Sequence, residues 1–303
     1  MSELDLSVNI AGVTFKNPVF TASGTFGAGR EYADFIDINT LGAVTTKGVS
    51  IVPWEGNKPP RIAEVHGGML NSIGLQNAGL EKFIQEDIPF LRQFGTKIIV
   101  NICGHTAEEY VSVARELYDA DVDMLELNIS CPNITEGGIA FGTDEKALYD
   151  VVYDVKSFAR QPLSVKLSPN VTNISKMAKI AADAGADALS LINTIVGMKI
   201  DVHTRKPVLN NVYGGLSGAG IKPVAVRMVH QVRTAIPYIP IIGMGGISSG
   251  EDAVEFLLAG ASAVSVGTAN FENPRATSFI LQGIRDYMTK YGFSSLNEIK
   301  LDE

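Results

Sequence analysis

The chain has 303 residues, a length that suits one large α/β barrel or two ordinary domains. Its hydrophobic content of 46% and charged content of 19% describe a soluble globular protein with a large core. The formal net charge of −8 argues against binding to nucleic acids or anionic membranes, because both favour basic surfaces.

The N-terminal segment carries Glu3 and Asp5 and no long apolar run, so no signal peptide is visible. No segment reaches the roughly 18 apolar residues of a membrane-spanning helix. Cys103 and Cys131 form neither a disulfide framework nor a CxxC metal site, and the four histidines lack ligand spacing. We therefore expect a cytoplasmic protein without a metal.

Residues 7–19 alternate around Ala11 and Gly12, which predicts a small N-terminal hairpin. After it a unit repeats, made of a short apolar strand, a polar or glycine-rich end and an amphipathic helix. The eight predicted strands cover residues 19–23, 43–48, 97–103, 124–130, 163–168, 188–194, 240–245 and 263–267. Predicted helices include residues 107–119, 145–160, 174–184, 223–235 and 251–259.

Eight strands alternating with helices favour a (β/α)₈ TIM barrel over a doubly wound sheet. No Pro/Ser-rich linker divides the chain, so residues 1–303 are predicted to form a single domain. Insertions follow strands two, four and six, at residues 49–76, 131–142 and 195–222. They leave the carboxyl ends of the strands, the face on which such barrels keep their chemistry.

The carboxyl ends of these strands are unusually polar. One polar residue there could be a core group whose hydrogen bonds are all made within the protein. Six polar side chains that converge at one end of the barrel are better explained by a polar ligand. Glycines close strands seven and eight; alone they could be ordinary turns, but beside lysines and asparagines they suggest a phosphorylated cofactor. A dinucleotide-binding GxGxxG loop is absent. These strand ends carry Ser23, Lys47, Gly48, Asn101, Asn128, Lys166, Asn193, Thr194, Gly245, Gly246, Gly267 and Thr268.

Cys131 follows the fourth strand, and Pro132 keeps its backbone extended rather than helical. A thiol fixed there is placed for proton transfer. The alternative is a small buried residue before a turn, which is the more common environment of a lone cysteine. We interpret Cys103 as a packing residue and Glu126 as an interior carboxylate paired with a lysine.

Seven short motifs closely resemble the dihydroorotate dehydrogenases, FMN enzymes of pyrimidine biosynthesis built on a (β/α)₈ barrel. They are NSIGLQN (71–77), NISCPN (128–133), KLSPN (166–170), INT (192–194), GGLSG (214–218), GMGG (243–246) and VGTANF (266–271). Cys131 stands at the position where the membrane-associated class has a serine, and in this the chain resembles class 1. The run NITEGGIAFGTD (133–144) resembles class 1B, the NAD-linked class, whose catalytic subunit works with a separate subunit carrying FAD and a [2Fe–2S] cluster.

The resemblance implies that Cys131 is the catalytic base, taking the C5 proton of dihydroorotate while hydride passes from C6 to FMN. One FMN per chain is implied, held by Ser23, Lys47, Gly48, Asn101, Asn128, Lys166, Ile192, Gly218, Gly245, Gly246, Gly267 and Thr268. The residues implied to bind the substrate are Lys47, Asn71, Ser72, Ile73, Gly74, Leu75, Asn128, Asn193 and Thr194.

The same resemblance implies that electrons leave through the partner subunit to NAD⁺. It also implies a homodimer of this chain within a heterotetramer. Two alternatives remain open: a class 1A-like enzyme that reduces fumarate without a partner, and a non-redox phosphate-binding lyase or isomerase on the same fold.

Overall fold

The computed structural model describes residues 4–129 and 141–301. Eight parallel strands close into a barrel in which every strand pairs with its neighbours in chain order, so the predicted TIM barrel is confirmed. The strands are β3 (Val19–Thr21), β4 (Ala43–Thr45), β7 (Lys97–Ile102), β8 (Met124–Asn128), β9 (Leu163–Lys166), β10 (Ala188–Leu191), β15 (Ile241–Met244) and β16 (Ala263–Val266). Each ends one to three residues before its predicted end, where the chain leaves the regular ladder to line the rim.

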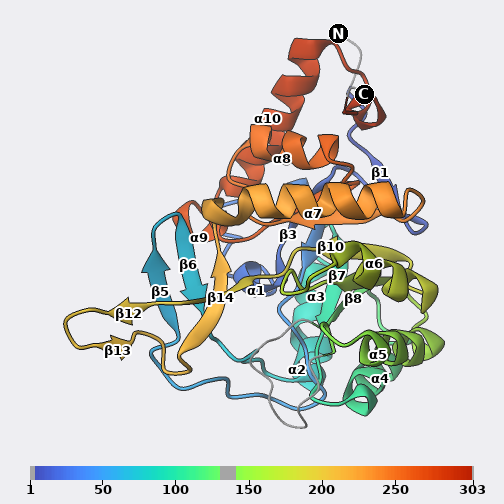
Figure 1. The fold of residues 1–303 in the computed structure, drawn as a ribbon. Coiled ribbons are helices and arrows are strands. Elements are labelled where there is room, and N and C mark those ends of the chain that lie inside the picture. Colours follow the sequence, from blue (N-terminus) through green and yellow to red (C-terminus); the bar gives the residue numbers. More distant parts are fainter. Residues whose placement is uncertain (1–3, 130–140, 302–303) are drawn as a thin grey trace.

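The main helices surround the barrel (Figure 1). They are α4 (Ala107–Glu116), α5 (Glu145–Phe158), α6 (Ile174–Asp183), α7 (Lys222–Ala235), α8 (Gly250–Leu258) and α10 (Ala276–Tyr291). The first five agree with the predicted helices, and α10 was not predicted. Side chains of Thr106, Asp144, Asn173 and Ser249 cap four of them by accepting a backbone N–H of the first turn.

Shorter elements fill the connections. The helical ones are α1 (Ser23–Phe26), α2 (Leu80–Lys82), a π-helical turn at Phe83–Asp87, α3 (Ile88–Leu91), α9 (Ala269–Glu272) and 3₁₀ turns at Ile38–Thr40, Ala219–Ile221 and Leu296–Glu298. The two ends of the described chain lie side by side (Figure 1), since the backbone N–H of Asp5 donates to the carbonyl of Ser294.

The predicted N-terminal hairpin is confirmed as β1 (Val8–Ile10) and β2 (Val13–Phe15), joined at Ala11 and Gly12, which both have positive φ. Ile10 and Phe15 are fully buried and belong to one cluster with Phe20 and the first residues of several barrel strands. The hairpin therefore covers the amino-terminal end of the barrel with apolar side chains. A polar ligand has to bind at the opposite, carboxyl end.

The insertions after strands two and six form a second sheet that was not predicted. It is antiparallel, in the order β11 (Ile195–Met198), β14 (Tyr213–Ser217), β6 (Gly68–Asn71) and β5 (Ile62–Val65). A further hairpin, β12 (Ile200–Asp201) and β13 (Lys206–Pro207), extends from this sheet as a projecting arm (Figure 1). The pairing of β6 with β14 joins segments far apart in the sequence and carries residues 71–75 to the barrel mouth.

An ionic cluster fastens the start of α8 to the start of α7. Ser249 and Asp252 form a capping box, and the Lys222 ammonium lies 2.7 Å from both Asp252 Oδ1 and Glu255 Oε2. Burial alone would raise the pKa of Asp252. The hydrogen bonds from Lys222, Ser248 and Ser249 outweigh burial and lower this pKa to about 2.

We expect Asp252→Asn to lower the free energy of unfolding by about 2 kcal/mol at pH 7. Because the pKa of Asp252 is lower in the folded chain than in the unfolded chain, its contribution is complete above about pH 4 and is lost as the pH falls towards 2. Urea unfolding at pH 7 and at pH 3 measures this difference. An equal loss of unfolding free energy at both pH values would contradict this expectation. The control is Glu255→Gln, which changes a more exposed partner of Lys222 and should lower the free energy of unfolding by under about 1 kcal/mol.

Candidate active site

All eight barrel strands deliver predicted site residues to the carboxyl end of the barrel. Because the strands are parallel, these ends lie on one face, and the described side chains there are mostly buried. Asn101 is fully buried, and Lys166 is only 6% exposed. Polar groups of this kind are buried at a cost unless each one has a hydrogen-bond partner.

A chain of hydrogen bonds links three of these strands, β7, β8 and β10, at their carboxyl ends. Asn193 Nδ2 donates to Asn128 Oδ1 and Asn128 Nδ2 donates to Asn101 Oδ1, both at 3.3 Å. Asn101 Nδ2 in turn donates to Glu126 Oε1 at 2.6 Å. At the other end, the backbone N–H of Thr194 donates to Asn193 Oδ1 at 2.8 Å. The three asparagines therefore act as one network rather than as separate ligands.

Lys166 joins this network through its charge. Its ammonium lies 4.0 Å from Glu126 Oε1 and 3.4 Å from Ser23 Oγ, to which it donates. The predicted pairing of Glu126 with a lysine is confirmed. A buried cation beside a buried carboxylate keeps the interior neutral while leaving polar atoms at the rim.

Lys47 and Gly48 follow β4 at the same face. Lys47 is exposed, and partial desolvation together with the nearby charge of Arg61 lowers its pKa, which Glu31 partly opposes. Gly48 is packed closely against Asn101 and Cys103, which leaves little room for a side chain. A Cβ at Gly48 would lie 3.0 Å from Asn101 Oδ1 and 3.4 Å from the sulfur of Cys103, a buried core residue as predicted.

The segment 71–75 reaches the barrel mouth from β6. Asn71 Nδ2 donates to the carbonyl of Gly215 at 3.3 Å, and Ser72 is buried. Asn57 holds Ser72 by donating to its carbonyl at 3.0 Å and to its hydroxyl at 3.1 Å. Gly74 and Leu75 both have positive φ, so the chain turns there. This turn brings Leu75 next to Gly48, since a Cβ at Gly48 would lie 3.5 Å from Leu75 Cδ2.

A glycine corner forms where β14, β15 and β16 end. Gly218, Gly245 and Gly246 all have positive φ, and a Cβ at Gly246 would lie 2.9 Å from the carbonyl oxygen of Gly218. Thr268 Oγ1 donates to Ser217 Oγ at 2.8 Å and ties the last strand to this corner. Backbone turned in this way without side chains is suited to close approach by an anion such as a phosphate.

Two predicted site residues, Cys131 and Ile192, remain to be placed, together with residues that the sequence did not predict. Cys131 lies outside the described residues, as does Ser130, so its role stays a prediction. Ile192 is buried directly after β10. Sequence reasoning missed Asn57, Ser217 and Ser190, although a serine inside the apolar strand β10 was a signal that the barrel interior holds a polar partner.

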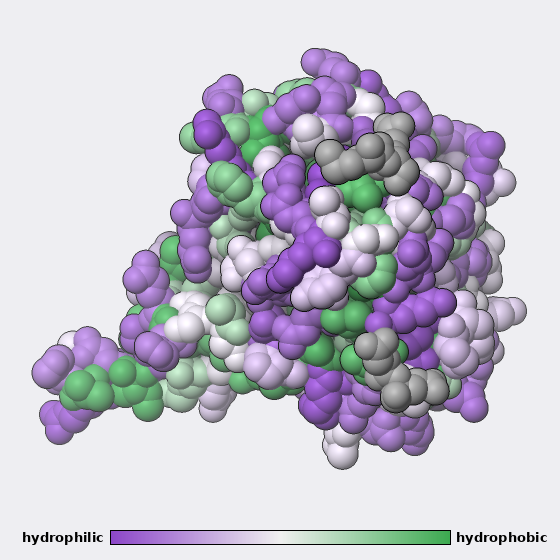
Figure 2. All heavy atoms as spheres, turned by 90° about the horizontal axis from the view of Figure 1, so that it is seen from above, coloured by the Kyte–Doolittle hydropathy of each residue, from purple (hydrophilic) through white to green (hydrophobic). Residues whose placement is uncertain are grey.

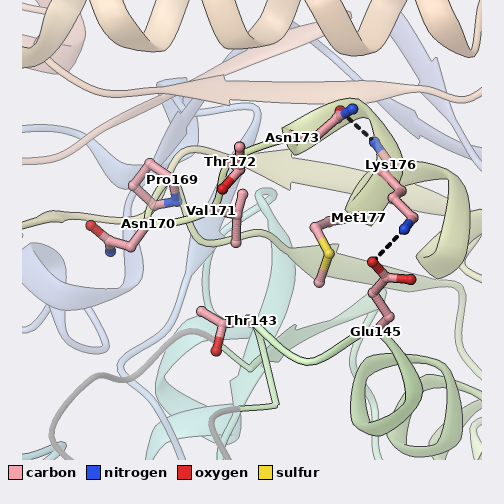
Figure 3. A pocket seen from close by; sticks show the side chains of 9 residues that line it. All are labelled: Thr143, Glu145, Pro169, Asn170, Val171, Thr172, Asn173, Lys176 and Met177. Carbon is pink, nitrogen blue, oxygen red and sulfur yellow. Dashed lines mark hydrogen bonds and ion pairs between the residues drawn. The ribbon is translucent and has the colours of Figure 1, made fainter.

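A cavity of about 650 Å³ opens beside this face, between the loop after β9 and the start of α5 (Figure 3). Its wall carries the Lys176–Glu145 ion pair and Asn170, and no predicted site residue lines it. Asn170 Nδ2 donates to the carbonyl of Thr194 at 3.1 Å, so the cavity adjoins the site through one residue. The strand ends, rather than this cavity, hold the groups suited to chemistry.

Two features are absent from the described residues, 4–129 and 141–301. These ranges include no helix long and apolar enough to cross a membrane. Within the same ranges, no three His, Cys, Asp or Glu side chains gather in a way that could hold a metal ion.

Comparisons with known proteins agree on one family. A family model described as dihydroorotate dehydrogenase matches residues 5–288. The chain is 62% identical over 300 residues to the dihydroorotate dehydrogenase B (NAD(+)) catalytic subunit of Alkaliphilus metalliredigens, covering 99% of each chain. The subunit of the same name from Lachnoclostridium phytofermentans is 58% identical over 98% of each chain. The one from Geotalea uraniireducens is 55% identical over 99% of this chain and 98% of the relative.

Proposed function

The chain belongs to the dihydroorotate dehydrogenase family, and from this premise we propose that it is the catalytic subunit of an NAD⁺-linked enzyme that oxidises dihydroorotate to orotate in pyrimidine biosynthesis. The observation that carries the proposal is the buried network of Asn193, Asn128, Asn101, Glu126 and Lys166 at the carboxyl end of the barrel. Carboxamides offer both donors and acceptors, which suits a planar ring with alternating polar atoms. The pathway also suggests a cytoplasmic enzyme.

The cofactor we propose is FMN, bound to a single domain that spans residues 1–303. The residues fit such a group, because the barrel rim carries buried polar side chains and, where β14, β15 and β16 end, a backbone turn made by glycines with positive φ. When bound, FMN would accept the hydride from C6 of dihydroorotate. We propose that Ser23, Gly48, Asn101, Lys166 and Ile192 contact its ring system, and that Gly218, Gly245, Gly246, Gly267 and Thr268 form the phosphate side.

The substrate is proposed to lie between the asparagine network and segment 71–75. Asn128, Asn193 and Thr194 would contact it from the barrel, and Asn71, Ser72, Ile73, Gly74 and Leu75 from the insertion. Lys47 would bind the substrate carboxylate, and its lowered pKa means that this charge is lost at a lower pH than for an ordinary lysine. Cys131 is proposed as the base that removes the C5 proton.

Electrons are proposed to pass from FMN to a separate subunit that carries FAD and a [2Fe–2S] cluster, and from there to NAD⁺. The relatives support this step because each is the catalytic subunit of an enzyme named for NAD(+). The proposed test asks which acceptor the purified chain can use.

The chain should purify with flavin absorbance in the visible range and should oxidise dihydroorotate with an artificial acceptor. NAD⁺ should be reduced only after the electron-transfer subunit is added. Turnover with fumarate by the chain alone would replace the NAD⁺-linked proposal with a fumarate-reducing enzyme. A colourless chain that binds phosphorylated metabolites would point instead to a lyase or isomerase.

A homodimer within a heterotetramer is also proposed, and an apolar surface supports it. The projecting arm exposes large hydrophobic side chains (Figure 2), and the sheet formed by β11, β14, β6 and β5 exposes others. These are Ile62, Val196, Met198, Ile200, Val202 and Tyr213, and Val202 is 76% exposed. Exposed hydrophobic side chains gathered on one part of a surface commonly mark an interface. Sedimentation of the chain alone should give a dimer, and a Val202→Glu, Ile200→Glu variant should give a monomer.

A further inference from the structure

Glu126 occupies an unusual position for a carboxylate. It lies within β8, is 2% exposed, and points into the barrel interior, where Asn101 Nδ2 donates to Oε1 at 2.6 Å and Ser190 Oγ donates to Oε2 at 2.7 Å. The Lys166 ammonium, 4.0 Å from Oε1, compensates its charge. The proposed reaction gives Glu126 no role, because it removes a single proton and assigns it to Cys131.

The hydrogen-bond chain that ends at Glu126 has a direction. A carboxylate only accepts hydrogen bonds, so Asn101 must turn its NH₂ group towards Glu126 and its oxygen towards Asn128. At the other end the backbone N–H of Thr194 only donates, so Asn193 must turn its oxygen towards it. The Glu126 carboxylate and the Thr194 N–H therefore favour the same orientation of the three carboxamides between them.

A reversed carboxamide anywhere in this chain would bring two donors or two acceptors together. Each asparagine can adopt two orientations of nearly equal shape, so packing alone does not choose between them. The choice matters to a ligand, because each carboxamide of Asn128 and Asn193 keeps a second N–H and a second oxygen lone pair that the network does not use. The orientation of the hydrogen-bond chain therefore sets where Asn128 and Asn193 present a donor and where they present an acceptor.

We propose that Glu126 is a positioning residue. It fixes the direction of the hydrogen-bond chain through Asn101, Asn128 and Asn193, and thereby the pattern of donors and acceptors that faces the substrate ring. This inference rests on the proposed function, since it assumes that Asn128 and Asn193 contact the substrate. Glu126 acts through Asn101 and does not itself touch the ligand. Its charge is the essential property, because a neutral carboxamide at this position would accept or donate equally well.

Three variants test this role, with orotate binding measured by titration calorimetry as the readout. Glu126→Gln keeps the shape but removes the fixed acceptor, and should weaken orotate binding and raise the KM for dihydroorotate about 10-fold, with a smaller effect on kcat. Asn101→Asp places two carboxylates against each other and should weaken binding by about 100-fold or more. The double variant restores a carboxamide–carboxylate pair in which the introduced carboxylate still accepts from Asn128, and should recover binding to within a few-fold of Glu126→Gln.

The matched control is Ser164→Ala, since Ser164 is fully buried on the neighbouring strand β9 and its hydroxyl has no hydrogen-bond partner among the described residues. This control should leave orotate binding unchanged. Wild-type affinity in Glu126→Gln, or a double variant no better than Asn101→Asp, would overturn the inference. A wild-type chain that fails to bind orotate would overturn the proposed function itself. Melting temperatures and flavin content, recorded for every variant, separate loss of folding or of cofactor from loss of orotate affinity.

Discussion

Replacing Cys131 with alanine is expected to slow flavin reduction by dihydroorotate by about 10²- to 10⁴-fold while leaving flavin bound. This is the usual contribution of a positioned general base to proton transfer. An ordinary thiol has a pKa near ~8.5, so the wild-type rate should rise with pH as the thiolate forms. In the variant this rise should disappear, because no group in its place gains basicity over that range.

Stopped-flow absorbance of the flavin, without any electron acceptor, measures this step directly. Cys103→Ala is the matched control, because it removes the other cysteine, which lies in the core and has no proposed catalytic part. It should change stability without a comparable loss of rate. If Cys131→Ala is reduced as fast as wild type, the base is another residue.

The barrel itself could be predicted because each strand is a short apolar run that ends in polar residues or glycine. The strand ends were less certain, and β10 shows why. Its predicted range continued to residue 194, and Ile192 and Asn193 do still donate backbone hydrogen bonds to Met244 and Leu167. The regular strand nevertheless ends at Leu191. Local hydrophobicity does not reveal where the chain begins to turn towards the rim.

The four-stranded sheet could not be predicted from local pattern. Its strands come from two insertions, and its central pairing sets Asn71 opposite Gly215. Gly215 is required there, since a Cβ would lie 2.1 Å from Thr194 Oγ1. In the sequence this glycine resembles any loop glycine. Long-range pairing of glycine-containing strands leaves little alternation to detect.

The candidate site was predicted as a set of residues but not as a network. Parallel strands bring their carboxyl ends together, so Asn101, Asn128 and Lys166 were expected on one face. Their contacts depend on register, which pairs Asn101 with Glu126 and Asn128 with Lys166 across neighbouring strands. Register follows from the stagger of the whole barrel, and no single strand encodes it.

Lys166→Met is expected to destabilise the folded chain by about 3–5 kcal/mol and to lower the reduction potential of the bound flavin. The stability loss follows because the Glu126 carboxylate, 2% exposed, loses the ammonium that lies 4.0 Å from it. The potential should fall because a positive charge near the cofactor favours the form that has gained electrons. Urea unfolding and spectroelectrochemistry measure the two effects, and methionine preserves the apolar packing of the lysine stem.

A second substitution separates the two roles of Lys166. Adding Glu126→Gln to Lys166→Met removes the unpaired charge, so much of the lost stability should return, whereas the potential should stay low because the cation is still absent. The control is Lys176→Ala, which breaks an ion pair between two largely exposed side chains and should cost under about 1 kcal/mol. If the double variant recovers both stability and potential, Lys166 acts only by balancing Glu126. If it recovers stability alone, the lysine carries a separate role towards the cofactor.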